Sequence, residues 1–162
     1  MDDGTRQYLS FDYTNGESWS RAIDYLDAAG QQYAKRTFFD DGSFQTRYFD
    51  YASSKPWSQY INYVNTRGQQ YAQRFFDDSG AWNTRYFDVE ANQPWSSYLD
   101  YVNADEQQYA RRYFQDSGDY DTQYFDHDAM QPWSSYTEFR HRDEQMYARQ
   151  TIDDGGTYRN EY

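Results

Sequence analysis

The chain has 162 residues, no cysteine, a formal net charge of −12, and 20 Tyr, 11 Phe and 5 Trp. Without cysteine it has neither disulfides nor thiolate metal sites, and its acidity opposes nucleic-acid binding, which depends on basic patches. No apolar run approaches the ~18 residues of a membrane helix. The segment Met1–Gly4 shows neither the basic nor the apolar stretch of a signal peptide, so none is expected here.

An internal repeat organises the whole chain. Its period is 38 residues, and no insertion or deletion breaks the register. The repeat is marked by a Trp-Ser pair, by a Tyr-Ala pair and by a glycine in an acidic turn. The Trp residues are Trp19, Trp57, Trp95 and Trp133, and the Tyr-Ala pairs begin at Tyr33, Tyr71, Tyr109 and Tyr147. A fixed period of this length is typical of a repeat architecture.

In chain order, we expect a leading strand over 5–12 and then four repeats over 13–50, 51–88, 89–126 and 127–162, the last of them truncated. Each repeat holds three strands, in which aromatic and β-branched residues alternate with polar ones. In the third repeat these strands are predicted over 95–103, 107–114 and 119–126. No helical stripe lasts longer than two turns, so the chain is predicted to be all-β.

Short hairpin loops are expected between the strands of a repeat. Sequences such as Asp40-Asp41-Gly42 combine a side-chain acceptor for the turn amides with a glycine that allows positive φ. The loop between the first and second strands has a glycine in two repeats, but Glu106 and Glu144 replace it in the others. Proline precedes Trp in three repeats, where a strand can begin without that N–H.

The strands do not separate into an apolar and a polar face. Both faces of the predicted second strand at 107–114 mix aromatic side chains with arginine. This favours an open antiparallel array with a thin, single-layer or solenoid-like sheet over a sandwich with a dry core. A four-bladed propeller, closed by residues 5–12, is the alternative. Residues 157–162 repeat that same strand position, and a ring has room for one copy, so the open array is preferred.

A family resemblance rests on the stretches 26–31 and 64–69. Leu26-Asp27-Ala28-Ala29-Gly30-Gln31 resembles the Tyr-Asp-x-x-Gly-Arg core of YD (Rhs-type) repeats, with Leu for Tyr and Gln for Arg. The Trp-Ser steps and Asp-Asp-Gly turns are similar to acidic tandem repeats of very large secreted bacterial proteins. The resemblance implies extracellular β-hairpin sheets that act as spacers, adhesive stalks or shells around a cargo, without chemistry of their own.

Two sets of repeated residues are candidate sites. Carboxylates at a fixed turn position offer the hard oxygen ligands that suit Ca²⁺, although Asp is also favoured in turns for its own hydrogen bonds. The Trp residues offer stacking platforms for a glycan, although a packing role at the junction between repeats is favoured for them. The candidate calcium ligands are Asp40, Asp78, Asp116 and Asp154, and the candidate platforms are Trp19, Trp57, Trp95 and Trp133.

The sequence therefore predicts a non-enzymatic structural or adhesive segment of a larger bacterial secreted or surface protein. The two histidines, His127 and His141, lie in the fourth repeat alone, which does not favour catalysis. The alternative function is a carbohydrate-binding module. The expected partners are neighbouring repeats of a longer chain, a glycan, and other copies through weak end-to-end association of the sheet edges. No cofactor other than Ca²⁺ is expected.

Overall fold

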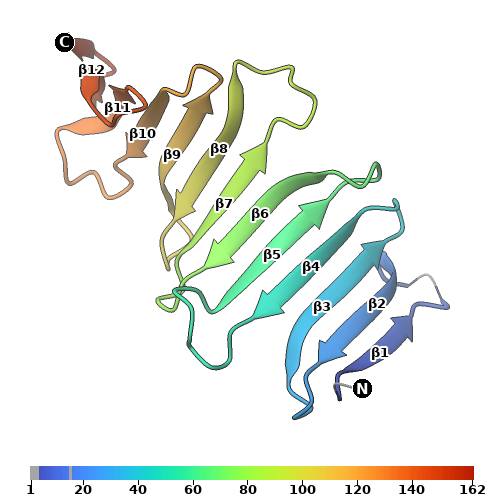
Figure 1. Cartoon of the computed structure of the whole chain (residues 1–162). Helices are drawn as coiled ribbons and strands as arrows, with labels where there is room; N and C mark the ends of the chain where they lie inside the picture. Colours follow the sequence, from blue (N-terminus) through green and yellow to red (C-terminus); the bar gives the residue numbers. More distant parts are fainter. Residues whose placement is uncertain (1–3, 15) are drawn as a thin grey trace. The chain divides into compact units, whose positions relative to one another are not determined.

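The structure, a computed structural model, describes residues 4–14 and 16–162 and contains thirteen β-strands (Figure 1). The strand order is the chain order, from β1 to β13, and every described pairing is antiparallel. The predicted all-β open array is confirmed, because a propeller would divide the strands into separate blades. Residues 1–3, part of the segment without signal-peptide features, lie outside the described ranges.

Two compact units, Met1–Asp78 and Ser79–Tyr162, make up the chain. The first unit contains β1 (Arg6–Phe11), β2 (Trp19–Leu26), β3 (Gln32–Phe39), β4 (Phe44–Phe49), β5 (Gln59–Val64) and β6 (Gln70–Phe76). The second contains β7 (Trp82–Phe87), β8 (Trp95–Val102), β9 (Gln108–Gln115), β10 (Tyr120–Phe125), β11 (Trp133–Arg140), β12 (Met146–Asp153) and β13 (Tyr158–Glu161). The leading strand and the three strands of the third repeat begin and end within one residue of their predicted limits.

The hairpin loops share one geometry. In the loop after β2, the Asp27 N–H donates to the Gln31 carbonyl at 2.9 Å, and the Gly30 N–H donates back to the Asp27 carbonyl at 3.0 Å. Gly30, the last of the three residues between this pair, has positive φ, which glycine adopts without steric cost. Glu106 and Glu144 take this conformation as well, with φ of 64° and 69°. The loops thus close without glycine, as the sequence requires, but the backbone there is strained.

Equivalent residues of successive repeats point to opposite faces of the sheet. In the second unit, Tyr86 pairs with Tyr98, Tyr98 with Tyr113, and Tyr113 with Asp121, so these four share a face. Tyr124 is the repeat equivalent of Tyr86, yet it lies three residues after Asp121 and therefore faces the other way. The cause is the odd number of strands per repeat, which reverses the strand direction and the face at each step.

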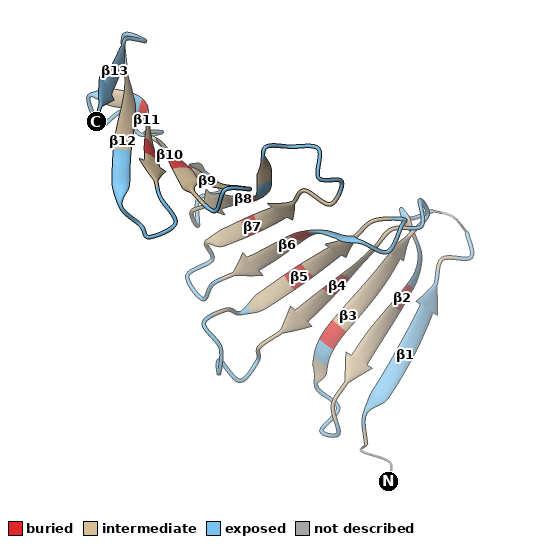
Figure 2. Ribbon diagram, turned by 45° about the horizontal axis from the view of Figure 1, so that its top comes forward, coloured by how far each residue is buried: buried red, intermediate tan, exposed pale blue. Residues whose placement is uncertain are grey.

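Each unit is a single layer. Within a unit, every described strand contacts only its neighbours in the chain. The buried residues lie singly along the strands in Figure 2, and most are small: Ala22, Ala34, Ala72, Ala110, Thr46, Thr84, Thr122, Ser97 and Ser135, beside Ile61 and Glu138. Large aromatic side chains cover them and stay partly exposed themselves. The prediction of a thin sheet without a dry core is confirmed.

One cross-strand polar pair recurs between the first and second strands of each repeat. Arg111 binds Asp100 through Nε and Nη2, at 2.5 and 2.9 Å, and Lys35 lies 3.7 Å from Asp24. In the second repeat both partners are amides, and Gln73 donates to Asn62 at 2.8 Å. The fourth repeat pairs Arg149 with Glu138. A charged pair in three repeats and an amide pair in the second thus link the same two strands in every repeat. The described residues contain no helix long and apolar enough to span a membrane.

Candidate functional site

The repeated tryptophans pack edge-on against tyrosines at the junctions between repeats. Trp57 lies 4.8 Å from Tyr60 with the rings at 87°. The pairs Trp95–Tyr98 and Trp133–Tyr136 are 5.1 and 4.7 Å apart, both at 89°. Trp19 has no such partner, because Ala22 occupies the tyrosine position in the first repeat. In the second unit, Trp95 and Trp133 lie with their tyrosines on opposite faces and do not form one row of platforms.

A stacked tyrosine pair completes each junction. The third strand of one repeat supplies Tyr48 and the first strand of the next supplies Tyr60, with ring centroids 4.5 Å apart. Tyr86–Tyr98 and Tyr124–Tyr136 repeat this stack at 4.7 and 4.6 Å. Burial raises the pKa of the Tyr60 phenol, and the charge of Tyr48 adds to the effect. The same three-ring cluster therefore joins each repeat to the next.

The candidate calcium ligands lie in four different hairpin loops. Asp40, Asp78, Asp116 and Asp154 each follow the second strand of a repeat. Since each loop contributes one of them, these four carboxylates do not converge. Among the described residues, no three Asp, Glu or His side chains are grouped closely enough to hold a metal ion.

Aspartates at the ends of the third strands cap the links between repeats. Asp88 accepts a hydrogen bond from the Gln93 N–H at 2.9 Å, and Asp126 accepts one from the Gln131 N–H at 2.8 Å. Asp12 accepts from the Glu17 N–H at 2.9 Å, and this bond, aided by Thr14, lowers the pKa of Asp12 although partial desolvation opposes it. Loop hydrogen bonding thus accounts for the regular spacing of these carboxylates.

A recess on the sheet face recurs in the two units, at positions 76 residues apart. Its centre in the first unit is the cross-strand row Tyr25, Ala34, Tyr48 on β2, β3 and β4. Because alanine is the middle residue, a space of about 160 Å³ stays open between two phenols whose strands lie about 9.6 Å apart. The equivalent recess in the second unit measures about 190 Å³. It is lined by Tyr101, Tyr109, Ala110, Arg112, Thr122 and Tyr124.

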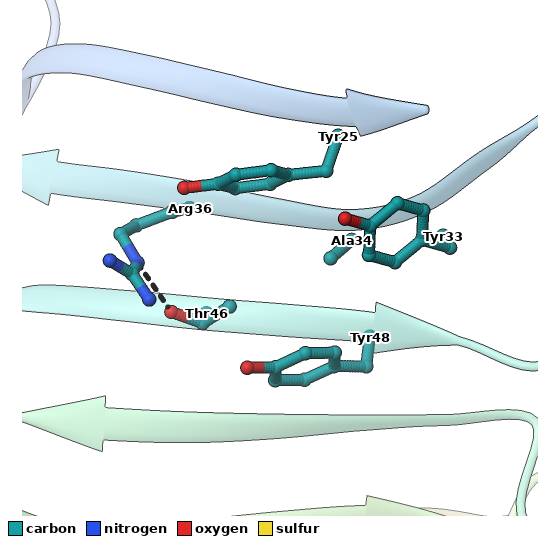
Figure 3. A pocket seen from close by; sticks show the side chains of 6 residues that line it. All are labelled: Tyr25, Tyr33, Ala34, Arg36, Thr46 and Tyr48. Atoms are coloured by element: carbon teal, nitrogen blue, oxygen red, sulfur yellow. Dashed lines mark hydrogen bonds between the residues drawn. The ribbon is translucent and has the colours of Figure 1, made fainter. Parts of the chain in front are cut away.

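An arginine and a threonine form the polar end of the recess. Figure 3 shows Arg36 between Tyr25 and Tyr48, and its Nε donates to Thr46 Oγ1 at 3.0 Å. Arg112 donates to Thr122 in the same way at 2.9 Å. The guanidinium has five N–H donors, and its described hydrogen bonds use Nε alone. The recess therefore offers a positioned cation with unused donors.

A β-bulge turns an additional tyrosine toward the recess. The register shifts between Tyr25 and Leu26, so Tyr33 is left without a direct partner beside Ala34. Bulges commonly redirect a side chain in this way. The Tyr33 ring lies 6.2 Å from that of Tyr25 and remains 42% exposed. Tyr71, Tyr109 and Tyr147 occupy the same bulge position in the other repeats.

Sequence reasoning missed this recess, although its signal was visible. The Tyr-Ala pair recurs in all four repeats, and in three of them Arg follows two residues after the alanine. In the sequence alone, the Tyr-Ala pair only marks the repeat period, because the alternating pattern of a strand does not reveal a bulge. The two histidines make separate contacts. His141 lies 3.5 Å from Asp119, and His127 contacts the Gln108 carbonyl.

Comparison with known proteins adds no assignment. No family model matches the chain, and no curated protein matches it. The resemblance to YD repeats therefore rests on the short sequence motifs alone.

Proposed function

We propose that the chain is a non-enzymatic structural segment, a spacer of stacked 38-residue repeats within a larger bacterial secreted or surface protein. The observation that carries this proposal is the identical aromatic junction of Trp and two stacked Tyr at the three boundaries between repeats. A junction of this kind lets repeats be added without a new topology, as in other repeat proteins. The resemblance of the short motifs to YD repeats supports the proposed location outside the cell.

Replacement of the junction tryptophan tests the spacer role. Trp95→Ala removes the edge-on contact with Tyr98, and we expect a loss of about 2–3 kcal/mol in the free energy of unfolding, below the range for a fully buried Trp because Trp95 is partly exposed. The measurement is urea unfolding followed by far-ultraviolet circular dichroism. Trp82→Phe is the matched control, since Phe44 holds that position in the first repeat. Unchanged stability of Trp95→Ala, with loss of glycan binding, would instead support a carbohydrate site at the tryptophans.

A second candidate function, carbohydrate binding, is supported by the bulge tyrosines rather than by the tryptophans. Tyr33, Tyr109 and Tyr147 are 42%, 44% and 45% exposed, whereas three of the four repeated tryptophans pack on tyrosine. Exposed tyrosine rings on a flat face suit the apolar face of a sugar, and their hydroxyls suit its polar edge.

Self-association through sheet edges is a further part of the proposal. All residues of β1 and β13 are exposed, and an unpaired edge strand is a template for another chain. We expect weak association between copies, which sedimentation velocity at increasing protein concentration would detect. An unchanged sedimentation coefficient over the whole concentration range would contradict it.

A further inference from the structure

We infer that the two recesses bind acidic sugar residues, as found in a polysaccharide of uronic acids, and that Arg36 and Arg112 recognise the carboxylate. The inference deepens the carbohydrate-binding candidate and is independent of the spacer role. It is carried by the same constellation of three tyrosines, alanine, threonine and arginine in both units.

The size and the lining residues of the recess suit a single sugar ring. Volumes of about 160 and 190 Å³ lie below the roughly 300 Å³ at which pockets for drug-sized ligands begin. The floor is Ala34 and Thr46, both almost fully buried, so no long aliphatic side chain lines it. Phenol rings flank this floor and leave their hydroxyl groups toward the arginine end in Figure 3. A sugar ring, with apolar faces and polar edges, matches such a surface better than a purely apolar ligand does.

The arginine selects a negative charge. Arg111 and Arg149 are engaged by carboxylates, but no described ion pair or hydrogen bond joins Arg36 or Arg112 to an acidic residue. Arg36 is instead held by Thr46 and lies over the Phe44 ring, 5.2 Å from its centroid. A guanidinium held in place in this way can receive a ligand carboxylate through two parallel hydrogen bonds.

The local charge favours an anion despite the net charge of the chain. Asp24 is the single acidic residue in the described strands β1–β6, and its pairing with Lys35 places it on the face opposite the recess. The recess face of this unit carries Arg21 and Arg36 instead. The other acidic residues of the unit lie in loops at the strand ends. An anionic ligand on the recess face of the first unit therefore meets cations first.

Repetition of a small open site points to a polymer. One ring in a shallow recess gains little affinity, but a polymer that carries the same ring many times raises the effective concentration of that ring at each recess. A polysaccharide of one acidic sugar presents the same group at every residue, and each of the two recesses can bind one such group. In the fourth repeat, Gln150 replaces the arginine and Asn160 the threonine, and these two are hydrogen-bonded to each other at 3.2 Å. The fourth repeat therefore forms the same strands without an arginine at this position.

Isothermal titration calorimetry with oligogalacturonate tests the inference on the full chain. We expect the acid to bind and its fully methyl-esterified form, which keeps the ring but loses the charge, not to bind. A chelator in the buffer excludes bridging by Ca²⁺ at the acidic loops. Binding that requires added Ca²⁺, or equal binding of acid and ester, would overturn the proposal, as would no binding of the acid.

Two variants locate the site. Arg36→Gln and Arg112→Gln are combined with Arg74→Gln, which covers the same sequence position of the intervening repeat, and affinity should fall at least tenfold. Lys35→Gln removes a cation from the opposite face and should leave affinity unchanged. Both changes are compatible with the fold, because Gln150 and Gln73 already occupy these positions. Retained binding in the triple variant, or an equal loss in Lys35→Gln, would overturn the assignment. The spacer role, tested through Trp95, would survive either result.

Discussion

At the scale of single residues, the last loop position between the first and second strands of a repeat decides whether that hairpin is strained. Gly30 and Gly68 hold this position with φ of 84° and 79° in the first two repeats, and Glu106 and Glu144 hold it in the last two. A side chain with a Cβ in the left-handed region costs about 1–2 kcal/mol. In this hairpin loop the third and fourth repeats therefore contain a strain that the first two avoid.

Replacing Glu106 with glycine should relieve this strain. We expect Glu106→Gly to raise the free energy of unfolding by about 0.5–1 kcal/mol, because relief of the positive φ exceeds the extra flexibility of glycine in the unfolded chain. Urea unfolding measures the change. The converse variant, Gly68→Ala, should destabilise through φ alone, since its new Cβ would meet no heavy atom within 4 Å.

Asp105→Gly is the control for the glutamate variant. Asp105 precedes Glu106 in the same loop, has no positive φ, and donates its N–H to Asn103 Oδ1 at 3.1 Å. A glycine at position 105 makes the unfolded chain more flexible but relieves no positive φ. The free energy of unfolding should therefore not rise. Equal stabilisation by both variants would mean that loop charge, and not φ, limits stability.

Glu138 should make stability depend on pH in the acidic range. It is 8% exposed and lies between Arg149 and Arg140, with contacts of 2.5 and 2.9 Å. Burial alone would raise the pKa of Glu138, but the hydrogen bonds from the two arginines outweigh it and lower the pKa. A carboxyl with a lowered folded pKa stabilises the fold above its unfolded pKa, and this contribution is lost as pH falls through the folded value.

Glu138→Gln isolates this contribution. We expect the variant to be less stable than the parent by about 2 kcal/mol near neutral pH, from lost hydrogen bonds to charged groups. The difference should shrink steadily below the ordinary pKa of glutamate, about 4.3. Unfolding titrations of both proteins from pH 7 to pH 3 would show it. A difference independent of pH would mean that packing of the side chain, not its charge, matters.

At the scale of elements, the polar pair between the first and second strands of each repeat behaves as one unit. Asp100→Asn and Arg111→Gln each break a charged, two-point hydrogen bond, and each should destabilise by about 1–2 kcal/mol. The double variant recreates the amide pair Asn62–Gln73 of the second repeat. The double variant should therefore lose less free energy of unfolding than the two single variants added together, with a coupling of about 1 kcal/mol in a double-mutant cycle. Additive losses would show that the pair is not coupled.

These elements can be predicted from the sequence to the extent that each produces a recognisable residue pattern. The unbroken 38-residue period and the acidic Gly turns predict the strands of the third repeat to within one residue. The mixed faces of the strand at 107–114 predict a single layer, which the structure confirms. The alternation of faces follows from three strands per repeat, but it becomes visible only when the cross-strand register joins Tyr86 to Tyr98 and Tyr113.

The candidate site was less predictable because it depends on one unpaired residue. Alternation assigns Tyr33 and Ala34 to opposite faces, and the bulge beside Leu26 overrides that assignment. Trp is the more conspicuous repeated aromatic, yet its ring is used in the junction with Tyr60. The recess forms where a small residue separates two large ones across three strands, and such a row cannot be recognised before the register is known.

At the scale of the whole molecule, positive and negative charges occupy different places along the chain. The described strands contain twelve of the fifteen Lys and Arg residues, but only six of the twenty-seven Asp and Glu residues. The acidic residues in strands are Asp24, Asp100, Asp121, Glu138, Asp153 and Glu161. The loops at the strand ends therefore carry most of the negative charge, close to like charges in the same loop. Their mutual repulsion opposes folding, and salt screens it.

Stability should therefore rise with ionic strength whatever the cation. Between low salt and physiological NaCl we expect a gain of about 1 kcal/mol, or roughly 2–4 °C in Tm for a chain of this size. At equal ionic strength, millimolar CaCl₂ and MgCl₂ should give the same melting temperature, because strand-end carboxylates such as Asp88 and Asp126 already accept backbone hydrogen bonds. A further rise that Ca²⁺ produces and Mg²⁺ does not, abolished by chelator, would contradict this and support calcium ligation by Asp40 and its equivalents. In that case replacing Asp116 with Asn should remove the calcium effect and leave the salt effect intact.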